Sequence, residues 1–229
     1  MKKNLTKICV IGLALVLFSG CDAVKNANNT QKGAVIGTTA GAVLGGIIGN
    51  NVGKRNSALG AVIGGVVGGV AGGVIGKQMD KQAQKIEEEI PGAEVTRVGE
   101  GIDIVFDENS GVYFDTNKFN INTKSRANLN KLAGIFKEYP DTNIIVEGHT
   151  DSTGNDDYNM ELSRKRASSV TSYLIAQGID KSRFTTYYHG ETLPKYDNAT
   201  AEGRAKNRRV EFGILANDKM IKEAKEKVD

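Results

Sequence analysis

The chain has 229 residues, of which 39% are hydrophobic and 6% aromatic, and it contains no Trp. This length allows one ordinary domain with additional segments and excludes a large multidomain enzyme. The net charge of +3 rests on Lys2, Lys3 and Lys7, because without these three lysines the 30 basic residues fall to 27 and equal the 27 acidic ones. Net charge therefore gives no support to nucleic-acid binding.

Residues 1–20 have the pattern of a lipoprotein signal peptide. Lysines precede an apolar run over 8–18, which is too short to span a bilayer as a retained helix, and small residues then precede Cys21. The stretch Leu17-Phe18-Ser19-Gly20-Cys21 resembles the lipobox of bacterial signal peptidase II, although Phe18 departs from the usual Leu. We therefore expect lipidation at Cys21. The alternative is a plain signal peptide followed by an ordinary buried cysteine.

A polar tether over 21–32 leads into a region in which glycine recurs at every fourth position. The repeat runs from Gly33 to Gly53 and restarts from Gly60 to Gly76, with a charged turn at 54–57. Glycine at this spacing leaves a groove along which helices can approach closely, so the pattern predicts a helical hairpin over 33–76, packed in or at a membrane and able to self-associate. A low-complexity spacer is the alternative.

The composition then changes to charged residues, which predicts a helical connector over 77–92. Apolar periodicity over 93–216 predicts alternating strands and helices, and a charged tail, expected to be a frayed helix, follows over 217–229. The expected strands cover 93–98, 101–106, 111–114, 143–147, 183–189 and 208–215, and the expected helices cover 122–139, 156–177 and 200–206. The sequence therefore predicts an α/β (α+β) sandwich with helices on one face of a mixed sheet.

One basic residue in the helix expected over 156–177 lies where an apolar side chain would be expected. At 100° per residue, Arg166 and Asn159 fall within the apolar arc. A buried guanidinium needs acceptors, and the best candidate is Asp151 in the preceding loop Gly-His-Thr-Asp-Ser-Thr-Gly. The residues leave two hypotheses open. The two side chains could neutralise each other, or they could stand apart and hold the two charged ends of a zwitterion.

Several motifs in order resemble one family over roughly residues 100–215. They are G-H-T-D-S-T-G, then Tyr158-Asn159-x-x-Leu162-Ser163-x-x-Arg166-Ala167-x-x-Val170, with Phe114-Asp115-Thr116-Asn117 upstream and Asn207-Arg208-Arg209-Val210-Glu211 downstream. The pattern is similar to the peptidoglycan-binding domain of the OmpA C-terminal and Pal family, a βαβαβ-type domain. The resemblance implies that Asp151 and Arg166 grip the free end of the stem-peptide diamino acid, typically diaminopimelate. It also implies supporting contacts from Asn117, Thr150, Asn159 and Arg208.

The residues offer no catalytic set, so we expect a protein that is not an enzyme. His149 and His189 are the only histidines, and neither H-E-x-x-H nor paired Cys/His spacing is present. His149 is interpreted as a packing residue at a strand end, and Ser152 lacks a G-x-S-x-G setting. No metal and no cofactor are expected.

The sequence therefore predicts an envelope lipoprotein that holds the outer membrane to the cell wall by noncovalent binding. Its expected partners are peptidoglycan with a diaminopimelate-type stem, the membrane through the lipid on Cys21 and the glycine hairpin, and further copies of itself, but no nucleic acid. The alternative is a glycine-zipper scaffold or pore-like assembly that the wall-binding domain localises. The periplasmic side of the outer membrane is expected, although Asp22 after the lipidated cysteine would favour the inner membrane in enterobacteria.

Overall fold

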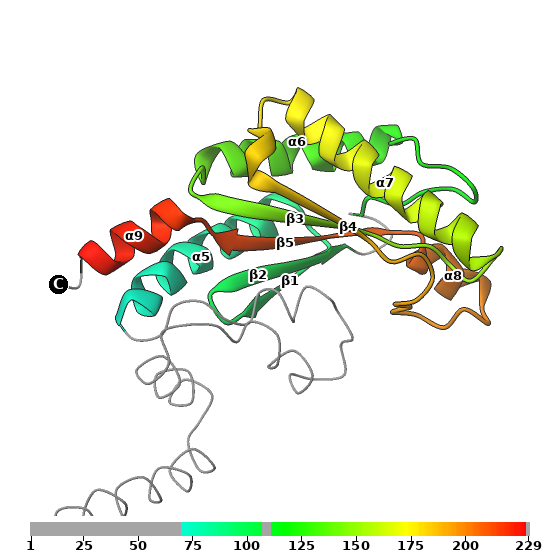
Figure 1. The fold of residues 1–229 in the computed structure, drawn as a ribbon, viewed down its shortest axis with the longest axis horizontal. Helices are drawn as coiled ribbons and strands as arrows, with labels where there is room; N and C mark the ends of the chain where they lie inside the picture. Colours follow the sequence, from blue (N-terminus) through cyan, green and yellow to red (C-terminus); the bar gives the residue numbers. More distant parts are fainter. Residues whose placement is uncertain (1–69, 107–110, 228–229) are drawn as a thin grey trace, which may run out of the picture. The chain divides into compact units, whose positions relative to one another are not determined.

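The computed structural model of the chain describes residues 70–106 and 111–227 (Figure 1). The predicted signal peptide, the tether with Cys21 and most of the glycine hairpin lie outside these residues. None of the helices within the described ranges combines the length and the apolar character that crossing a membrane requires.

A five-stranded mixed sheet forms the centre of the domain, in the order β1-β2-β5-β3-β4. The strands are β1 (Ala93–Val98), β2 (Gly101–Phe106), β3 (Thr142–Gly148), β4 (Phe184–Tyr188) and β5 (Val210–Ala216). Only β3 and β4 pair in parallel, and the other neighbours are antiparallel. The predicted fold class is confirmed, and the β1-β2 hairpin has the predicted bounds. The segment 111–114 contributes only an isolated bridge between Tyr113 and Arg209 instead of a strand.

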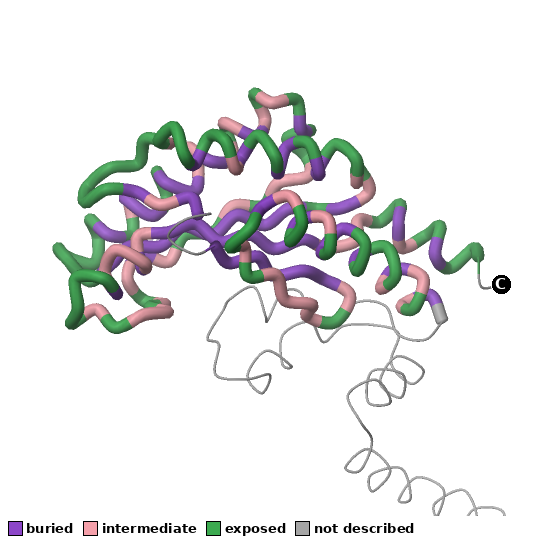
Figure 2. The backbone as a smooth tube through the Cα atoms, turned by 180° about the vertical axis from the view of Figure 1, so that it is seen from behind, coloured by how far each residue is buried: buried purple, intermediate pink, exposed green. Residues whose placement is uncertain are grey.

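Five described helices surround the sheet, and all but the shortest contribute buried residues to one large core. They are α5 (Val70–Glu89), α6 (Thr123–Glu138), α7 (Asp156–Ala176), α8 (Ala201–Asn207) and α9 (Asp218–Glu226), with a short 3₁₀ turn at Lys181–Arg183. Ile144 and Phe212 from the sheet join Phe136 from α6 and Val170 from α7 in this core, and all four are fully buried. Figure 2 shows the strands as the buried centre and the outer faces of the helices as exposed.

Local sequence signals set the ends of the two central helices. The side chain of Asn122 accepts a hydrogen bond from the Ser125 N–H at 2.8 Å and caps α6, and Asn155 caps α7 in the same way. Such caps satisfy backbone donors that a helix start leaves free. Pro140 lies just beyond α6, and Gly178 follows α7 with a φ of 92°, a left-handed value that glycine adopts at little cost.

The two terminal helices are integral parts of the domain. In α5, the end of the expected glycine hairpin (70–76) and most of the expected connector (77–89) form one helix, whose Ile75, Met79 and Ile86 are fully buried in the core. The expected frayed tail is the regular helix α9, which contacts α5 and buries Met220 and Ala224. In each of the two helices, apolar residues spaced three or four positions apart form the face that packs against the core, although charged residues dominate the sequence.

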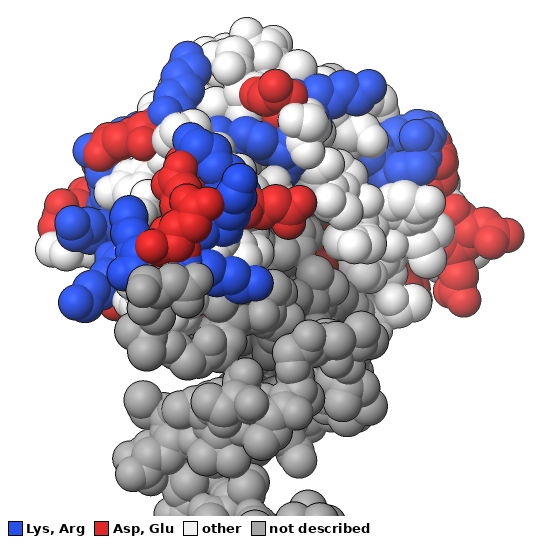
Figure 3. All heavy atoms as spheres, turned by 60° about the vertical axis from the view of Figure 1, so that its left-hand side comes forward, with Lys and Arg blue, Asp and Glu red and all other residues white. Residues whose placement is uncertain are grey.

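On the face of the domain turned forward in Figure 3, basic and acidic side chains are interspersed. Ion pairs of the described residues include Lys219 with Asp141 at 3.1 Å and Lys85 with Glu138 at 2.5 Å. All four side chains are at least partly exposed, so each pair adds little to stability.

Candidate functional site

A pocket lies where β3 ends and the loop toward α7 begins. Its empty volume, including the open mouth, is about 180 Å³. The pocket brings together all six residues that the resemblance assigns to binding, from four separate stretches of the chain. They are Asn117, Thr150, Asp151, Asn159, Arg166 and Arg208, and the remaining lining residues are Thr116, Thr153 and Leu162.

Arg166 lies fully buried in α7, as its place on the helix predicts, and backbone carbonyls satisfy it. Its Nε donates to the Lys118 carbonyl at 3.0 Å, Nη1 to the His149 carbonyl at 3.0 Å, and Nη2 to the Asp115 carbonyl at 3.3 Å. Its guanidinium also lies over the Phe114 ring, 5.2 Å from the centroid. Burial, together with the nearby charge of Arg208, lowers the pKa of Arg166 to about 10, so the guanidinium is charged at neutral pH.

Asp151 is buried beside Arg166 but does not pair with it. Its Oδ2 accepts a hydrogen bond from Arg208 Nη1 at 2.8 Å, and its Oδ1 accepts one from the Thr153 N–H at 2.8 Å. Burial alone would raise the pKa of Asp151, but the bonds from Arg208 and Thr153 outweigh it and hold the pKa below its ordinary value. The structure thus shows an ion pair of Asp151 with Arg208 and none with Arg166, and the clamp stays a prediction.

A tight turn shapes one wall of the pocket. The Lys118 N–H donates to the Asp115 carbonyl at 3.0 Å, and Asn117 within this turn has a φ of 60°. Among residues other than glycine, Asn tolerates this left-handed conformation comparatively well. Because Arg166 binds the carbonyls of both Asp115 and Lys118, the guanidinium holds the turn in place.

Thr150 and Asn159 line the pocket with polar side chains that are almost fully buried. The Thr150 N–H donates to the Gly190 carbonyl at 2.8 Å, while its Oγ1 has no hydrogen-bond partner in the described part of the chain. Asn159 Nδ2 donates to a carboxylate oxygen of Glu191. The pocket thus offers a guanidinium, a carboxylate and an unused hydroxyl to a ligand.

Three lining residues and a second polar cluster were not singled out from the sequence. Thr116 and Thr153 belong to the quoted motifs, and Leu162 precedes Arg166 by one helical turn, so the motifs held a signal for them. The second cluster contains Glu147 and His149, which are nearly or fully buried. Nothing in the local sequence reveals that cluster, because its members come from separate strands and loops.

Two family models match the chain. Residues 113–208 match the OmpA family, and residues 1–80 match the YMGG-like Gly-zipper. The first range contains every residue that the resemblance assigns to the pocket.

Two curated relatives and one solved structure are similar to this chain. The chain is 41% identical over 130 residues to the probable lipoprotein YiaD of Escherichia coli strain K12, which covers 57% of this chain and 59% of that protein. It is 39% identical over 98 residues to the peptidoglycan-associated lipoprotein of Buchnera aphidicola subsp. Baizongia pistaciae, covering 43% of this chain and 57% of that protein. The structure of the cell wall anchor of the T6SS from Pseudomonas aeruginosa aligns with a TM-score of 0.51 and 25% identity, covering 61% of this chain and 97% of that one.

The chain thus spans less than two thirds of the length of either curated relative. The matched ranges, the mixed sheet and the pocket agree with one another. Residues 113–208 therefore form a domain that is similar to the OmpA family, and residues 1–80 are similar to the YMGG-like Gly-zipper.

Proposed function

We propose that the protein holds a membrane of the cell envelope to the cell wall by noncovalent binding of the peptidoglycan stem peptide, without catalysis. The observation that carries this proposal is the pair Asp151 and Arg166, which line one pocket as opposite charges and do not neutralise each other. The names of the Buchnera lipoprotein and of the Pseudomonas cell wall anchor support the same role.

The hydrogen-bond inventory of Arg166 supports carboxylate binding. A guanidinium carries five N–H donors, and three of those of Arg166 go to backbone carbonyls. One donor on each terminal nitrogen therefore remains for a ligand, an arrangement that suits two oxygens of one carboxylate. Asp151 retains acceptor positions beyond those used by Arg208 and Thr153, and these suit an ammonium group.

The charge balance of the lining favours a ligand with more carboxylates than ammonium groups. Asp151 supplies one negative charge, whereas Arg166 and Arg208 supply two positive ones. Diaminopimelate at the end of a stem peptide carries an ammonium and a carboxylate at its free end and a second carboxylate where the peptide stops. A lysine in that position would lack the carboxylate beside the ammonium, so we propose that the pocket prefers diaminopimelate.

The N-terminal segment would supply the membrane attachment. We propose lipidation at Cys21 and a location on the periplasmic side of the outer membrane. The Gly-zipper match over residues 1–80 and the lipoprotein names of the two relatives support this part of the proposal. Membrane fractionation of cells that express wild-type protein or Cys21→Ser tests it, since the variant should leave the membrane fraction.

Sedimentation with purified cell-wall sacculi tests the pocket. Asp151→Asn keeps the size of the side chain and removes its charge, so retention on sacculi should fall at least tenfold. Asp180→Asn is the matched control, because Asp180 Oδ1 accepts from the Ser182 N–H at 2.8 Å as Asp151 Oδ1 does from Thr153, but Asp180 lies outside the pocket. Free diaminopimelate should release the wild-type protein, and lysine should not. Full retention of a folded Asp151→Asn variant would refute the clamp.

A further inference from the structure

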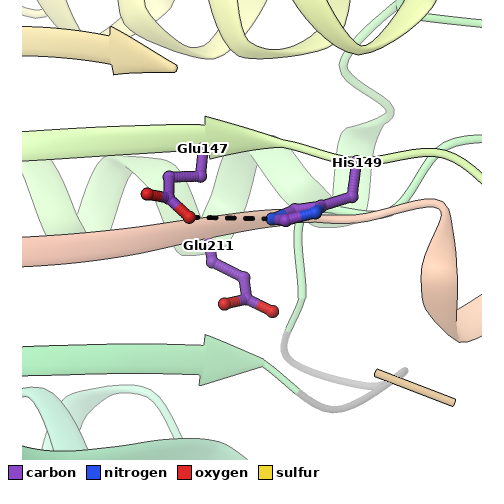
Figure 4. A group of neighbouring side chains, drawn as sticks. All are labelled: Glu147, His149 and Glu211. Carbon is purple, nitrogen blue, oxygen red and sulfur yellow. Dashed lines mark ion pairs between the residues drawn. The ribbon is translucent and has the colours of Figure 1, made fainter. Parts of the chain in front are cut away.

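Four polar side chains meet on the sheet face that points away from the large core. Glu147 of β3 and Glu211 of β5 are direct partners in the strand register, and they alternate with Val146 and Phe212, which point into the core. His149 follows β3 directly, and Figure 4 shows its ring facing the carboxylate of Glu147, with Glu211 beside the two. His189, just after β4, completes the group.

The distances within the group are short for residues that come from different elements. One ligand atom from each of Glu147, His149 and Glu211 lies within 4.8 Å of the others. The Nε2 of His189 lies 3.4 Å from Glu147 Oε2, and the centroids of the two imidazole rings are 5.2 Å apart. Within the described ranges, this is the one such group of potential metal ligands.

The polar atoms of this group are buried without hydrogen-bond partners. Glu147 is 0% exposed and His149 is 2% exposed, and among the described residues neither the two carboxylate oxygens of Glu147 nor the two ring nitrogens of His149 have a hydrogen-bond partner. The contact between Glu147 and His189 is close but lacks hydrogen-bond geometry. In the described part of the chain, Glu147 lies within ion-pair distance only of the imidazoles of His149 at 3.9 Å and His189 at 3.4 Å, which carry a positive charge only when protonated, so a buried carboxylate here calls for a ligand of opposite charge.

Neighbouring cations satisfy only Glu211. Arg209 Nε donates to Glu211 Oε1 at 2.6 Å, and Lys195 Nζ lies 3.9 Å from the same oxygen. Arg209 thereby orients Glu211 and leaves the second carboxylate oxygen of Glu211 for a further partner. Hydrogen bonds from neighbouring residues orient metal-binding carboxylates in the same way.

We propose that Glu147, His149, His189 and Glu211 form a binding site for a divalent zinc ion. Two imidazole nitrogens and two carboxylate oxygens are a donor set that zinc takes in tetrahedral geometry, with bonds of roughly 2.0–2.2 Å. Such bonds place the ligand atoms roughly 3.3 Å apart. Glu147, His149 and Glu211 therefore require only small side-chain movements, and His189 lies 3.4 Å from Glu147. The partial exposure of His189, at 17%, gives the ion a route from solvent.

The positive charges of Arg209 and Lys195 set the strength of the site. The negative charges of the two carboxylates neutralise the charge of the zinc ion, but the positive charges of Arg209 and Lys195 near Glu211 repel it. We therefore expect an affinity well below that of structural zinc sites with thiolate ligands, with one ion bound per chain in the micromolar range of free zinc.

Titration of the full-length protein in detergent with Co²⁺ and then Zn²⁺ tests the site. Co²⁺ should give the visible absorption of a tetrahedral ion without thiolate charge transfer, which separates this site from Cys9 and Cys21, and Zn²⁺ should displace it at one equivalent. The variants are Glu147→Gln and His189→Gln, and Glu161→Gln is the control because Glu161 is a half-exposed acid on α7. His189→Gln alters a partly exposed side chain, so we expect it to fold.

We expect each site variant to lower zinc affinity at least tenfold and the control to leave it unchanged. Zinc should raise the Tm of wild-type protein by several degrees and leave that of folded His189→Gln unchanged. Without metal, Glu147→Gln should melt higher than wild type, because it removes an unpaired buried charge. The proposal would be overturned if wild-type protein bound no zinc in the micromolar range. It would also be overturned if both folded variants bound zinc as tightly as wild type, and a buried water would then occupy the group.

Discussion

Arg166, which is fully buried, and Arg183, which is half-buried, have nearly the same bonding, so the binding role of Arg166 can be separated from its structural role. Arg183 donates to the carbonyls of Thr142 at 2.7 Å, Phe136 at 2.7 Å and Tyr139 at 2.9 Å, as Arg166 donates to three carbonyls at the other end of β3. The strand of seven residues places the two arginines about 20 Å apart. Only Arg166 lines the pocket.

Lysine at either position keeps the positive charge but cannot reach three divergent carbonyls. We expect at least two charge-assisted hydrogen bonds to be lost in each variant. Arg166→Lys should lower the free energy of unfolding by about 2–4 kcal/mol, and Arg183→Lys by about 1–3 kcal/mol because water reaches the half-buried Arg183 more easily. Urea unfolding followed by circular dichroism measures both losses.

The two variants should differ in binding to the cell wall. Arg166→Lys also removes the two N–H donors left for a ligand carboxylate, a loss of about 2–3 kcal/mol, which corresponds to roughly 30- to 100-fold weaker retention on sacculi. Arg183→Lys should retain wild-type binding within about twofold, since its bonds are remote from the pocket. Equal retention of both variants under conditions where both are folded would show that Arg166 has only a structural role.

Three further substitutions test how the domain is held together. Gly148→Ala should lower the free energy of unfolding by about 1–3 kcal/mol, because a Cβ there would lie 2.2 Å from the Ser163 carbonyl oxygen of α7. An unchanged midpoint of urea unfolding would contradict this close approach. Asn207→Ala should cost about 2–4 kcal/mol, since the buried amide binds the backbone of Tyr196 through both of its ends. Asn207→Asp should be no more stable than Asn207→Ala, because a carboxylate oxygen in place of Nδ2 would face the Tyr196 carbonyl and cannot donate to it. Met220→Asp should cost about 2–4 kcal/mol and release α9 from the core, seen as faster amide exchange in that helix; protection equal to wild type would show that α9 contributes nothing.

The secondary structure could be predicted where strong local signals bounded it. Pro140 and Gly178 mark the ends of α6 and α7, and the caps Asn122 and Asn155 mark their starts. The burial of Arg166 also followed from its helical position alone. Local spacing carries this information because it depends on the geometry of one helix.

The partners of the buried charges could not be predicted in the same way. The helical position of Arg166 predicts a carboxylate partner, but its partners in the structure are backbone carbonyls, which every residue possesses and which leave no mark in a sequence. Asp151 meets Arg208, which lies 57 positions later and reaches it only because of the fold. The pairing of Glu147 with Glu211 likewise depends on the register of two strands that are far apart in the chain.

The packing of α5 has a mechanical consequence. This helix begins at one end of the domain, and α7 begins beside the pocket at the other end (Figure 1). A pull on the chain ahead of Val70, opposed by a ligand held in the pocket, would load the whole length of the domain and act first on the buried side chains of α5. The packing of Ile75, Met79 and Ile86 in the core would then set the resistance of the protein to stretching, and the flexibility of a linker would not.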